Sequence, residues 1–177
     1  MLATLFFLAL ASISHAATVT ISASDPSISL TPGWSQQFSQ SAQNSYIQTD
    51  SLLCDLTATL PPSATSVSYV GYKRAGGSTY GYTLDCEDDC ILQTANGTDL
   101  SVSDDATALQ STIFSIDMDP STQHTLRVYN IPSEASNGAS KITFDHLSVL
   151  VQDHIPGNHD RSHASLDQSN LSPYNSQ

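Results

Sequence analysis

The sequence predicts an all-β domain, an antiparallel β-sandwich, and three observations support this prediction. Short runs of alternating apolar and polar residues recur along the chain, about eight or nine of them, separated by Pro, Gly, Asn and Asp. The chain is rich in Ser and Thr and poor in Lys and Glu, a composition that disfavours helices. No segment sustains a helical period of 3.6 residues. Short strands at such spacings are typical of sandwiches and barrels.

The start of the chain has the pattern of a secretory signal. An apolar run from Leu2 to Ile13 precedes Ser14-His15-Ala16, in which small residues flank one spacer. The run is too short for an ordinary membrane span, and no later segment is apolar for long enough. We therefore expect a secreted, extracellular protein without a membrane span after cleavage. The expected parts are a signal peptide over 1–16, a β-sandwich domain over 17–153 and a disordered polar tail over 154–177.

The expected strands follow the alternating runs, beginning directly after the signal. Val19 and Ile21 share one face of the first run, and Pro32-Gly33 marks a turn in the next stretch. We expect a polar loop over 40–50, and a short helix or 3₁₀ turn fits 106–110. The remaining expected strands are 51–60, 65–73, 78–86, 90–94, 112–117, 124–130 and 141–152.

The cysteines indicate one disulfide and one thiol. Cys86 and Cys90 flank Glu87-Asp88-Asp89, between two strand-like runs. A tight reversal through these three acidic residues would make the cysteines cross-strand neighbours, within the reach of a disulfide. Because the loop is small, the disulfide would stabilise the fold only weakly. Cys54 is expected as a buried free thiol, although a bond from Cys54 to Cys86 or Cys90 stays an alternative.

The charge of the chain excludes some classes of partner. The formal net charge is −12, from 17 acidic and 5 basic residues. Such a surface repels nucleic acid and anionic membranes.

Two Asn-x-Ser/Thr sequences, at Asn96 and Asn170, are acceptors for N-glycosylation in an exported protein.

Evidence for catalysis or metal binding is weak. Carboxylate pairs at Asp88-Asp89, Asp104-Asp105 and Asp117/Asp119 would suit a glycosidase, but any acidic protein carries such pairs as solvated loop charge. No G-x-S-x-G motif is present. Three histidines lie in the tail with neighbouring Asp residues, and a tail without fixed geometry makes a poor metal site. We expect no catalytic residue, no metal and no cofactor.

The most promising ligand-binding stretch is YKRAGGSTY. It is expected as an exposed hairpin in which Tyr72, Lys73 and Arg74 lead into a glycine turn and Tyr80 follows. Cationic side chains donate to sugar hydroxyls or carboxylates, and aromatic faces stack on sugar rings. Trp34 is a further candidate platform, with a place in the core as the alternative. An ordinary hairpin with basic stems along its surface is the alternative for the whole stretch.

The chain resembles the galactose-binding-like jelly-roll modules of exported or membrane-anchored proteins of mushroom-forming (basidiomycete) fungi. The resemblance rests on PGWS, SVSYVGYKRAGGSTYGYTLD, STIFSIDMDPSTQHTLRVYN and SKITFDHLSVLVQD in this order, and it covers about residues 18–153. Such proteins often continue into a serine-rich stalk and a transmembrane helix, which this chain does not contain. They usually carry glycine after the Y-x-L-D strand, where this chain has CEDDC.

The resemblance implies a jelly-roll sandwich and a non-catalytic module that binds cell-wall or other extracellular glycans. A structural or adhesion domain without a small ligand is the first alternative, and a glycoside hydrolase or lyase is the second.

Overall fold

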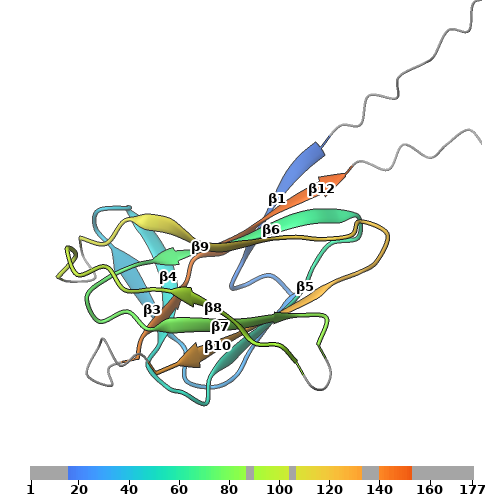
Figure 1. The fold of residues 1–177 in the computed structure, drawn as a ribbon. Coiled ribbons are helices and arrows are strands. Elements are labelled where there is room, and N and C mark those ends of the chain that lie inside the picture. Colours follow the sequence, from blue (N-terminus) through green and yellow to red (C-terminus); the bar gives the residue numbers. More distant parts are fainter. Residues whose placement is uncertain (1–15, 87–89, 104–106, 133–139, 153–177) are drawn as a thin grey trace, which may run out of the picture.

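The chain folds into a β-sandwich of two main sheets with a smaller third sheet at one end (Figure 1). The computed structural model describes residues 16–86, 90–103, 107–132 and 140–152, and none of these is helical. Within these residues no helix is long and apolar enough to cross a membrane. All pairings between neighbouring strands are antiparallel.

Each sheet joins strands from distant parts of the sequence. The first sheet has the order β1 (Ala16–Ser22), β12 (His146–Gln152), β6 (Ala64–Tyr72) and β9 (Gln110–Asp117). The second sheet has the order β2 (Ile28–Leu30), β5 (Asp55–Thr59), β10 (Thr125–Ile131), β7 (Thr79–Leu84) and β8 (Gln93–Asn96). The third sheet has the order β11 (Ile142–Phe144), β4 (Asn44–Thr49) and β3 (Ser35–Ser39).

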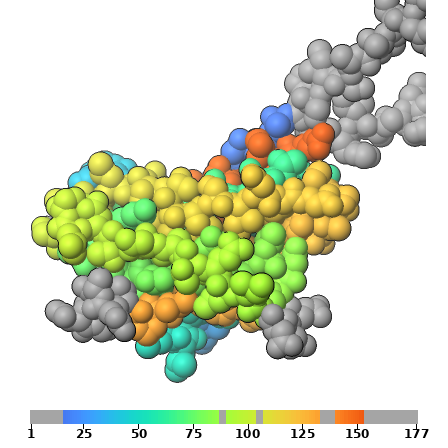
Figure 2. All heavy atoms as spheres, viewed as in Figure 1, coloured from blue at the N-terminus to red at the C-terminus, as the bar shows by residue number. Residues whose placement is uncertain are grey.

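The core lies between the first and second sheets, because alternate residues of their strands point inward. Tyr69 of β6 is fully buried, packs against Phe114 of β9 and meets Tyr80 of β7 edge-on. Tyr82 of β7 stacks on Phe114 with 3.9 Å between the ring centroids, which joins the two sheets directly. Figure 2 shows the side on which β9 lies above β8, where the side chains meet without a deep opening.

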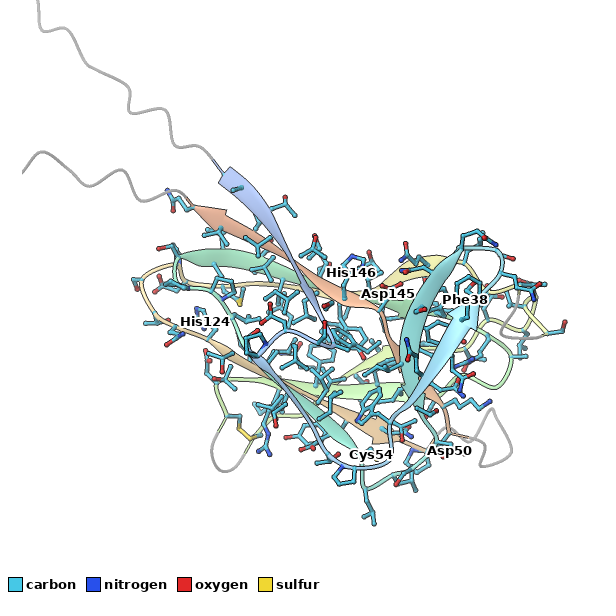
Figure 3. All side chains as sticks on the ribbon, turned by 180° about the vertical axis from the view of Figure 1, so that it is seen from behind. Phe38, Asp50, Cys54, His124, Asp145 and His146 are labelled. Atoms are coloured by element: carbon cyan, nitrogen blue, oxygen red, sulfur yellow. A yellow bond between two sulfur atoms is a disulfide. The ribbon has the colours of Figure 1, made fainter. Side chains whose placement is uncertain are left out.

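The chain passes from the third sheet to the first at Asp145, between β11 and β12. Five donor contacts from four side chains surround its carboxylate: the Asn44 amide at 2.9 and 3.1 Å, Tyr72 Oη at 2.9 Å, Gln110 Nε2 at 2.5 Å and His146 Nδ1 at 3.1 Å. Burial, followed by the hydrogen bond to Asp145, raises the pKa of Tyr72. Figure 3 shows Asp145 and His146 where β12 meets the β3–β4 hairpin.

Several strand boundaries differ from the prediction. The stretch 40–50, expected as a loop, contains β4, whose polar residues Asn44 and Gln48 hydrogen-bond inside the protein. The expected strand 141–152 is two strands, because the chain changes sheets at Asp145. The expected strand 51–60 begins only at Asp55. Val19 is 39% exposed, although Ile21 on the same face is buried. Residues 107–110 form no helix, while Ala106, the leader through residue 15 and the tail from residue 153 lie outside the described residues.

Gly71 of β6 lies where the first and third sheets come close together, so a substitution there tests this contact. A Cβ atom at this position would lie 2.8 Å from Thr143 Oγ1 and 2.9 Å from the Thr143 carbonyl oxygen. Gly71→Ala is therefore expected to lower the free energy of unfolding by about 1–3 kcal/mol in urea denaturation. Gly76→Ala is the matched control, because a Cβ there meets nothing within 4 Å. Equal stability of the two variants would contradict the packing described here.

Candidate functional site

The glycine-rich stretch that we predicted as an exposed ligand site is largely buried. Tyr72 is 1% exposed, Arg74 3% and Tyr80 0%, so the expected exposure of these three side chains is wrong. The Arg74 guanidinium hydrogen-bonds Gln48 Oε1 at 3.1 Å and Tyr46 Oη at 3.5 Å. The turn is no open hairpin, because bridges from Arg74 to Thr98 and from Gly77 to Lys141 hold two other segments against it.

Lys73 and Trp34, the other two candidates, are partly buried and lie in different places. Lys73 follows the end of β6. The Trp34 ring packs against the core, and its Nε1–H donates to the carbonyl oxygen of Asp55 at 3.2 Å. The alternative of a core position describes Trp34 better than an open platform does. The structure does not bring the five candidates together on one exposed surface.

Cys86 and Cys90 form a disulfide with 5.6 Å between their Cα atoms. They are not cross-strand neighbours as expected, because β7 ends at Leu84 and β8 begins at Gln93. The turn residues 87–89 lie outside the described part of the chain. Cys54 is a buried free thiol, as predicted, and its Sγ contacts the Pro32 carbonyl oxygen at 3.0 Å. The alternative bond from Cys54 to Cys86 or Cys90 is therefore wrong.

A different surface carries the functional groups: the outward face of the second sheet, called the outer face below. It is formed by the side chains that point away from the core, and register places Thr57 and Thr83 beside Arg127 of β10, and Asp55 and Gly81 beside Tyr129. The alternation is strict along β10, in which Leu126 and Val128 are fully buried while Arg127 and Tyr129 are partly exposed.

Arg127, Asp55 and Tyr129 form a compact group on the outer face. Arg127 NH2 lies 3.4 Å from Asp55 Oδ2, and the Arg127 side chain is 42% exposed. The guanidinium carbon lies 5.8 Å from the centre of the Tyr129 ring, within the range of a cation–π interaction. A Cβ at Gly81 would overlap Ile131, so the glycine allows Ile131 to lie across the sheet beside Tyr129. A planar ring, a cation and a carboxylate thus stand next to one another on a sheet surface.

A broad depression continues this group toward the start of β10. Its volume is about 1110 Å³, and it is lined by Thr57, Asp85, Cys86, Thr122, Gln123, Thr125 and Arg127. Nearly all of these side chains are polar, and three of them carry hydroxyl groups. The disulfide at Cys86 forms part of one wall. From Thr125 to Tyr129 the face extends for about 13 Å along the strand, at ~3.3 Å per residue.

His124 lies beneath the depression and connects two of its walls. Its Nδ1 contacts Asp85 Oδ2 at 2.5 Å, and its Nε2 contacts the carbonyl oxygen of Asp119 at 2.7 Å. The hydrogen bond to Asp85, followed by the one to Asp119, raises the pKa of His124 above its ordinary value. Asp85 has a left-handed backbone, with φ of 52°, and its second oxygen accepts the Thr125 N–H at 2.7 Å. Figure 3 shows His124 well apart from Asp145 and His146.

A second, smaller depression lies between β1, the β3–β4 hairpin and Asp145. It has a volume of about 210 Å³ and includes Ser22, Gln36, Ser45 and Phe144 in its lining. Its carboxylate, Asp145, is already surrounded by donors from the protein, so it has little capacity left for a ligand. The outer face is therefore the better candidate.

The described residues contain no group of three or more His, Cys, Asp or Glu side chains that could hold a metal ion.

Asn96 is exposed at the end of β8, and its Oδ1 accepts the Thr98 N–H at 2.9 Å. Glycosylation at Asn96 stays a prediction, and Asn170 lies outside the described residues.

Sequence reasoning missed Arg127 and Tyr129. The alternation in HTLRVYN could have identified them, because it places them on the face of the strand opposite to Leu126 and Val128.

Comparisons with known proteins support the fold. No protein-family model matches the sequence, and no curated protein matches it. Among solved structures, a family 35 carbohydrate-binding module from Clostridium thermocellum matches with a TM-score of 0.50 at 11% identity, over 75% of this chain and 97% of the module. This match confirms the predicted antiparallel sandwich of the jelly-roll type. The fungal affiliation stays a prediction.

Two larger proteins contain a similar sandwich. A family two carbohydrate esterase from Cellvibrio japonicus matches with a TM-score of 0.50 at 16% identity, over 77% of this chain. The insecticidal crystal protein Cry2Aa matches with a TM-score of 0.53 at 14% identity, over 76% of this chain. The chain corresponds to only 34% of the esterase and 21% of the crystal protein. At these identities the likeness establishes a fold shared with carbohydrate-binding modules.

Arg74 is expected to stabilise the fold rather than bind a ligand. Arg74→Ala would remove the hydrogen bonds that the guanidinium donates to the buried Tyr46 and the partly buried Gln48, and lower the free energy of unfolding by about 1–3 kcal/mol. Lys73→Ala, at the neighbouring partly exposed position, should change it by no more than about 0.5 kcal/mol. Urea denaturation of both variants measures the difference. An Arg74→Ala variant as stable as the wild type would show that the guanidinium is not held as described.

Proposed function

We propose that this domain is a non-catalytic carbohydrate-binding module that holds a neutral glycan across the outer face, along β10. One observation carries the proposal: Tyr129, Arg127 and Asp55 stand together beside a depression of about 1110 Å³ lined by hydroxyl and amide side chains. The shared fold with a family 35 carbohydrate-binding module supports it.

The chemistry of the outer face suits sugars. The faces of a pyranose ring carry C–H groups that pack against an aromatic ring, whereas its hydroxyl groups point sideways and both donate and accept hydrogen bonds. Tyr129 offers the ring. Arg127 offers donors and Asp55 an acceptor within one ion pair, so a pair of neighbouring hydroxyls can bind to both. The threonine hydroxyls and Gln123 extend these contacts over more than one sugar.

The charges of the outer face favour a neutral glycan over an acidic one. The positive charge of Arg127 is offset by Asp55, and Asp85 adds a carboxylate that is 44% exposed. The whole chain carries a formal net charge of −12. A uronic acid or sulfated sugar would therefore meet net repulsion.

The same contacts disfavour a glycoside hydrolase at this face. Such an enzyme needs one carboxylic acid that stays protonated to donate to the leaving group. Asp55 pairs with Arg127, and Asp85 pairs with His124, so both of these carboxylates, which lie among the described residues, have a basic partner.

The setting we propose for this binding is outside the cell, on cell-wall or other extracellular glycans. The secretory pattern of residues 1–16, the two N-glycosylation sequences and the Cys86–Cys90 disulfide are each typical of exported proteins.

A glycan array that includes neutral and uronic acid polysaccharides tests the proposal. The wild type is expected to bind neutral glycans, and Tyr129→Ala should weaken this binding at least about tenfold, equivalent to ~1.4 kcal/mol, because the stacking surface is lost. Tyr129→Phe keeps the ring and should retain most of the affinity. Leu150→Ala removes a side chain that is 38% exposed on the first sheet, and serves as the matched control.

Two results would contradict the proposal. One is wild-type binding by Tyr129→Ala, which would place the ligand elsewhere. The other is the absence of binding to any neutral glycan by wild-type protein that urea denaturation shows to be folded.

A further inference from the structure

The nearest partner of each ring nitrogen of His124 is an oxygen that only accepts hydrogen bonds, while the Thr122 hydroxyl, which can also donate, lies farther from Nε2. Nε2 faces the Asp119 carbonyl oxygen at 2.7 Å, with the Thr122 hydroxyl at 3.2 Å, and Nδ1 faces the Asp85 carboxylate at 2.5 Å. A carbonyl oxygen and an ionised carboxylate have no proton to give. A neutral imidazole has one N–H, so one of its nitrogens would direct a lone pair at an oxygen. The geometry therefore fits the imidazolium ion, which donates from both nitrogens.

The imidazolium joins two walls of the depression on the outer face. One wall includes Asp85 and Cys86 after β7, and the other includes Thr122, Gln123 and Thr125 before and within β10. Asp85 connects them a second time, since its Oδ1 accepts the Thr125 N–H at 2.7 Å and its own N–H donates to the Thr125 carbonyl oxygen at 2.9 Å. The left-handed backbone of Asp85 is held by these contacts.

The groups that face the ring come from both walls. Asp85 faces Nδ1 and Asp119 lies on the side of Nε2, with its own carboxylate bound to the Ser121 N–H at 2.9 Å. Hydrogen bonds from Ser121 lower the pKa of Asp119, so this carboxylate stays ionised to a lower pH than an ordinary aspartate does. Histidine is the side chain whose ordinary pKa lies between pH 5 and 8. Across neutral pH, the charge that changes at this junction is that of His124.

We propose that His124 is a positioning residue for the outer face: its protonated ring holds the two walls of the depression in their ligand-binding arrangement, so that affinity for a neutral glycan falls when the ring loses its proton. The inference rests on the proposed function for the ligand, but the connection between the walls can be measured without any ligand. The His124 side chain is only 5% exposed, so we expect it to affect the ligand through its contacts with Asp85 and Thr125 and not by touching the ligand.

The direction of the pH effect follows from the raised pKa of His124. The unfolded chain has the ordinary histidine pKa near 6.5. The stabilisation from the charged ring is fully present below about pH 6.5 and is lost as the pH rises through the higher pKa of the folded state. Acidic conditions are thus expected to keep the walls joined, and alkaline conditions to loosen them.

The first experiment needs no ligand. Exchange of the Thr125 amide hydrogen, measured by NMR at pH 5.5 and pH 9 and corrected for intrinsic exchange, should show lower protection at pH 9 in the wild type. In His124→Gln the protection should be low at both pH values. The two N–H groups of a glutamine amide are on a single nitrogen, so they cannot reach Asp85 and the Asp119 carbonyl oxygen on opposite sides. His146→Gln is the control, as His146 contacts Asp145 away from the depression. Equal protection of Thr125 in the wild type and His124→Gln at pH 5.5 would overturn the positioning role.

The second experiment uses native affinity gels that contain galactomannan, mixed-linkage β-glucan or arabinoxylan as the neutral probes. Wild-type affinity is expected to fall about fivefold or more from pH 5.5 to pH 9, at the lower end of typical coupling between two sites. His124→Gln should bind weakly and without this pH dependence, whereas a purely structural histidine would leave the pH profile of binding unchanged. Asp85→Asn, which removes the charge beside the ring, should move the fall in affinity to lower pH.

The outcomes separate the two proposals. A wild type that binds a probe equally at both pH values overturns the inference and leaves the proposed function standing. A wild type that binds no probe at either pH contradicts the proposed function, while the exchange of the Thr125 amide still decides whether His124 holds the walls together.

Discussion

Three consecutive buried residues, Thr143 to Asp145, hold the three sheets together. The Thr143 N–H donates to Tyr80 Oη of the second sheet at 2.8 Å, and its carbonyl oxygen accepts from Tyr69 Oη of the first sheet at 2.8 Å. Asp145 then accepts from Asn44 of the third sheet and from Gln110 of the first. A buried polar group without its partner would cost about 1–3 kcal/mol, so these contacts must form together. They fix where each sheet lies.

This junction explains why aromatic and basic residues that look exposed in the sequence lie inside. Tyr72, Tyr80 and the backbone of Gly71 surround Thr143, and the turn that follows β6 is covered by two other segments. The buried polar groups around Thr143 therefore find their hydrogen-bond partners inside the protein, at one end of the sandwich. The second sheet is then left with an outward face on which Arg127 pairs with Asp55 and lies beside Tyr129, and this is the face that we propose binds a glycan.

Period-two alternation predicted strands that pair regularly with their neighbours, such as β6, in which Val67 and Tyr69 are both buried in the core. It did not predict β4, because Asn44 and Gln48 are polar and point inward to partners far along the chain. For the same reason, Arg74 looked like a surface cation: its acceptors come from β4, and no local pattern brings them close. Arg127 and Tyr129 were within reach of the alternation, but their arrangement with Asp55 depends on the pairing of β10 with β5.

Strand β10 unites the core, the proposed ligand face and the histidine contacts. Its inward residues Leu126 and Val128 are fully buried, its outward residues Arg127 and Tyr129 carry the candidate site, and Thr125 at its start bonds Asp85. Since β10 pairs with β5 on one side and with β7 on the other, we expect a shift at Thr125 to be passed along the strand to its outward side chains. A change of charge at His124 can therefore reach Arg127 and Tyr129 without any contact between the ring and the ligand.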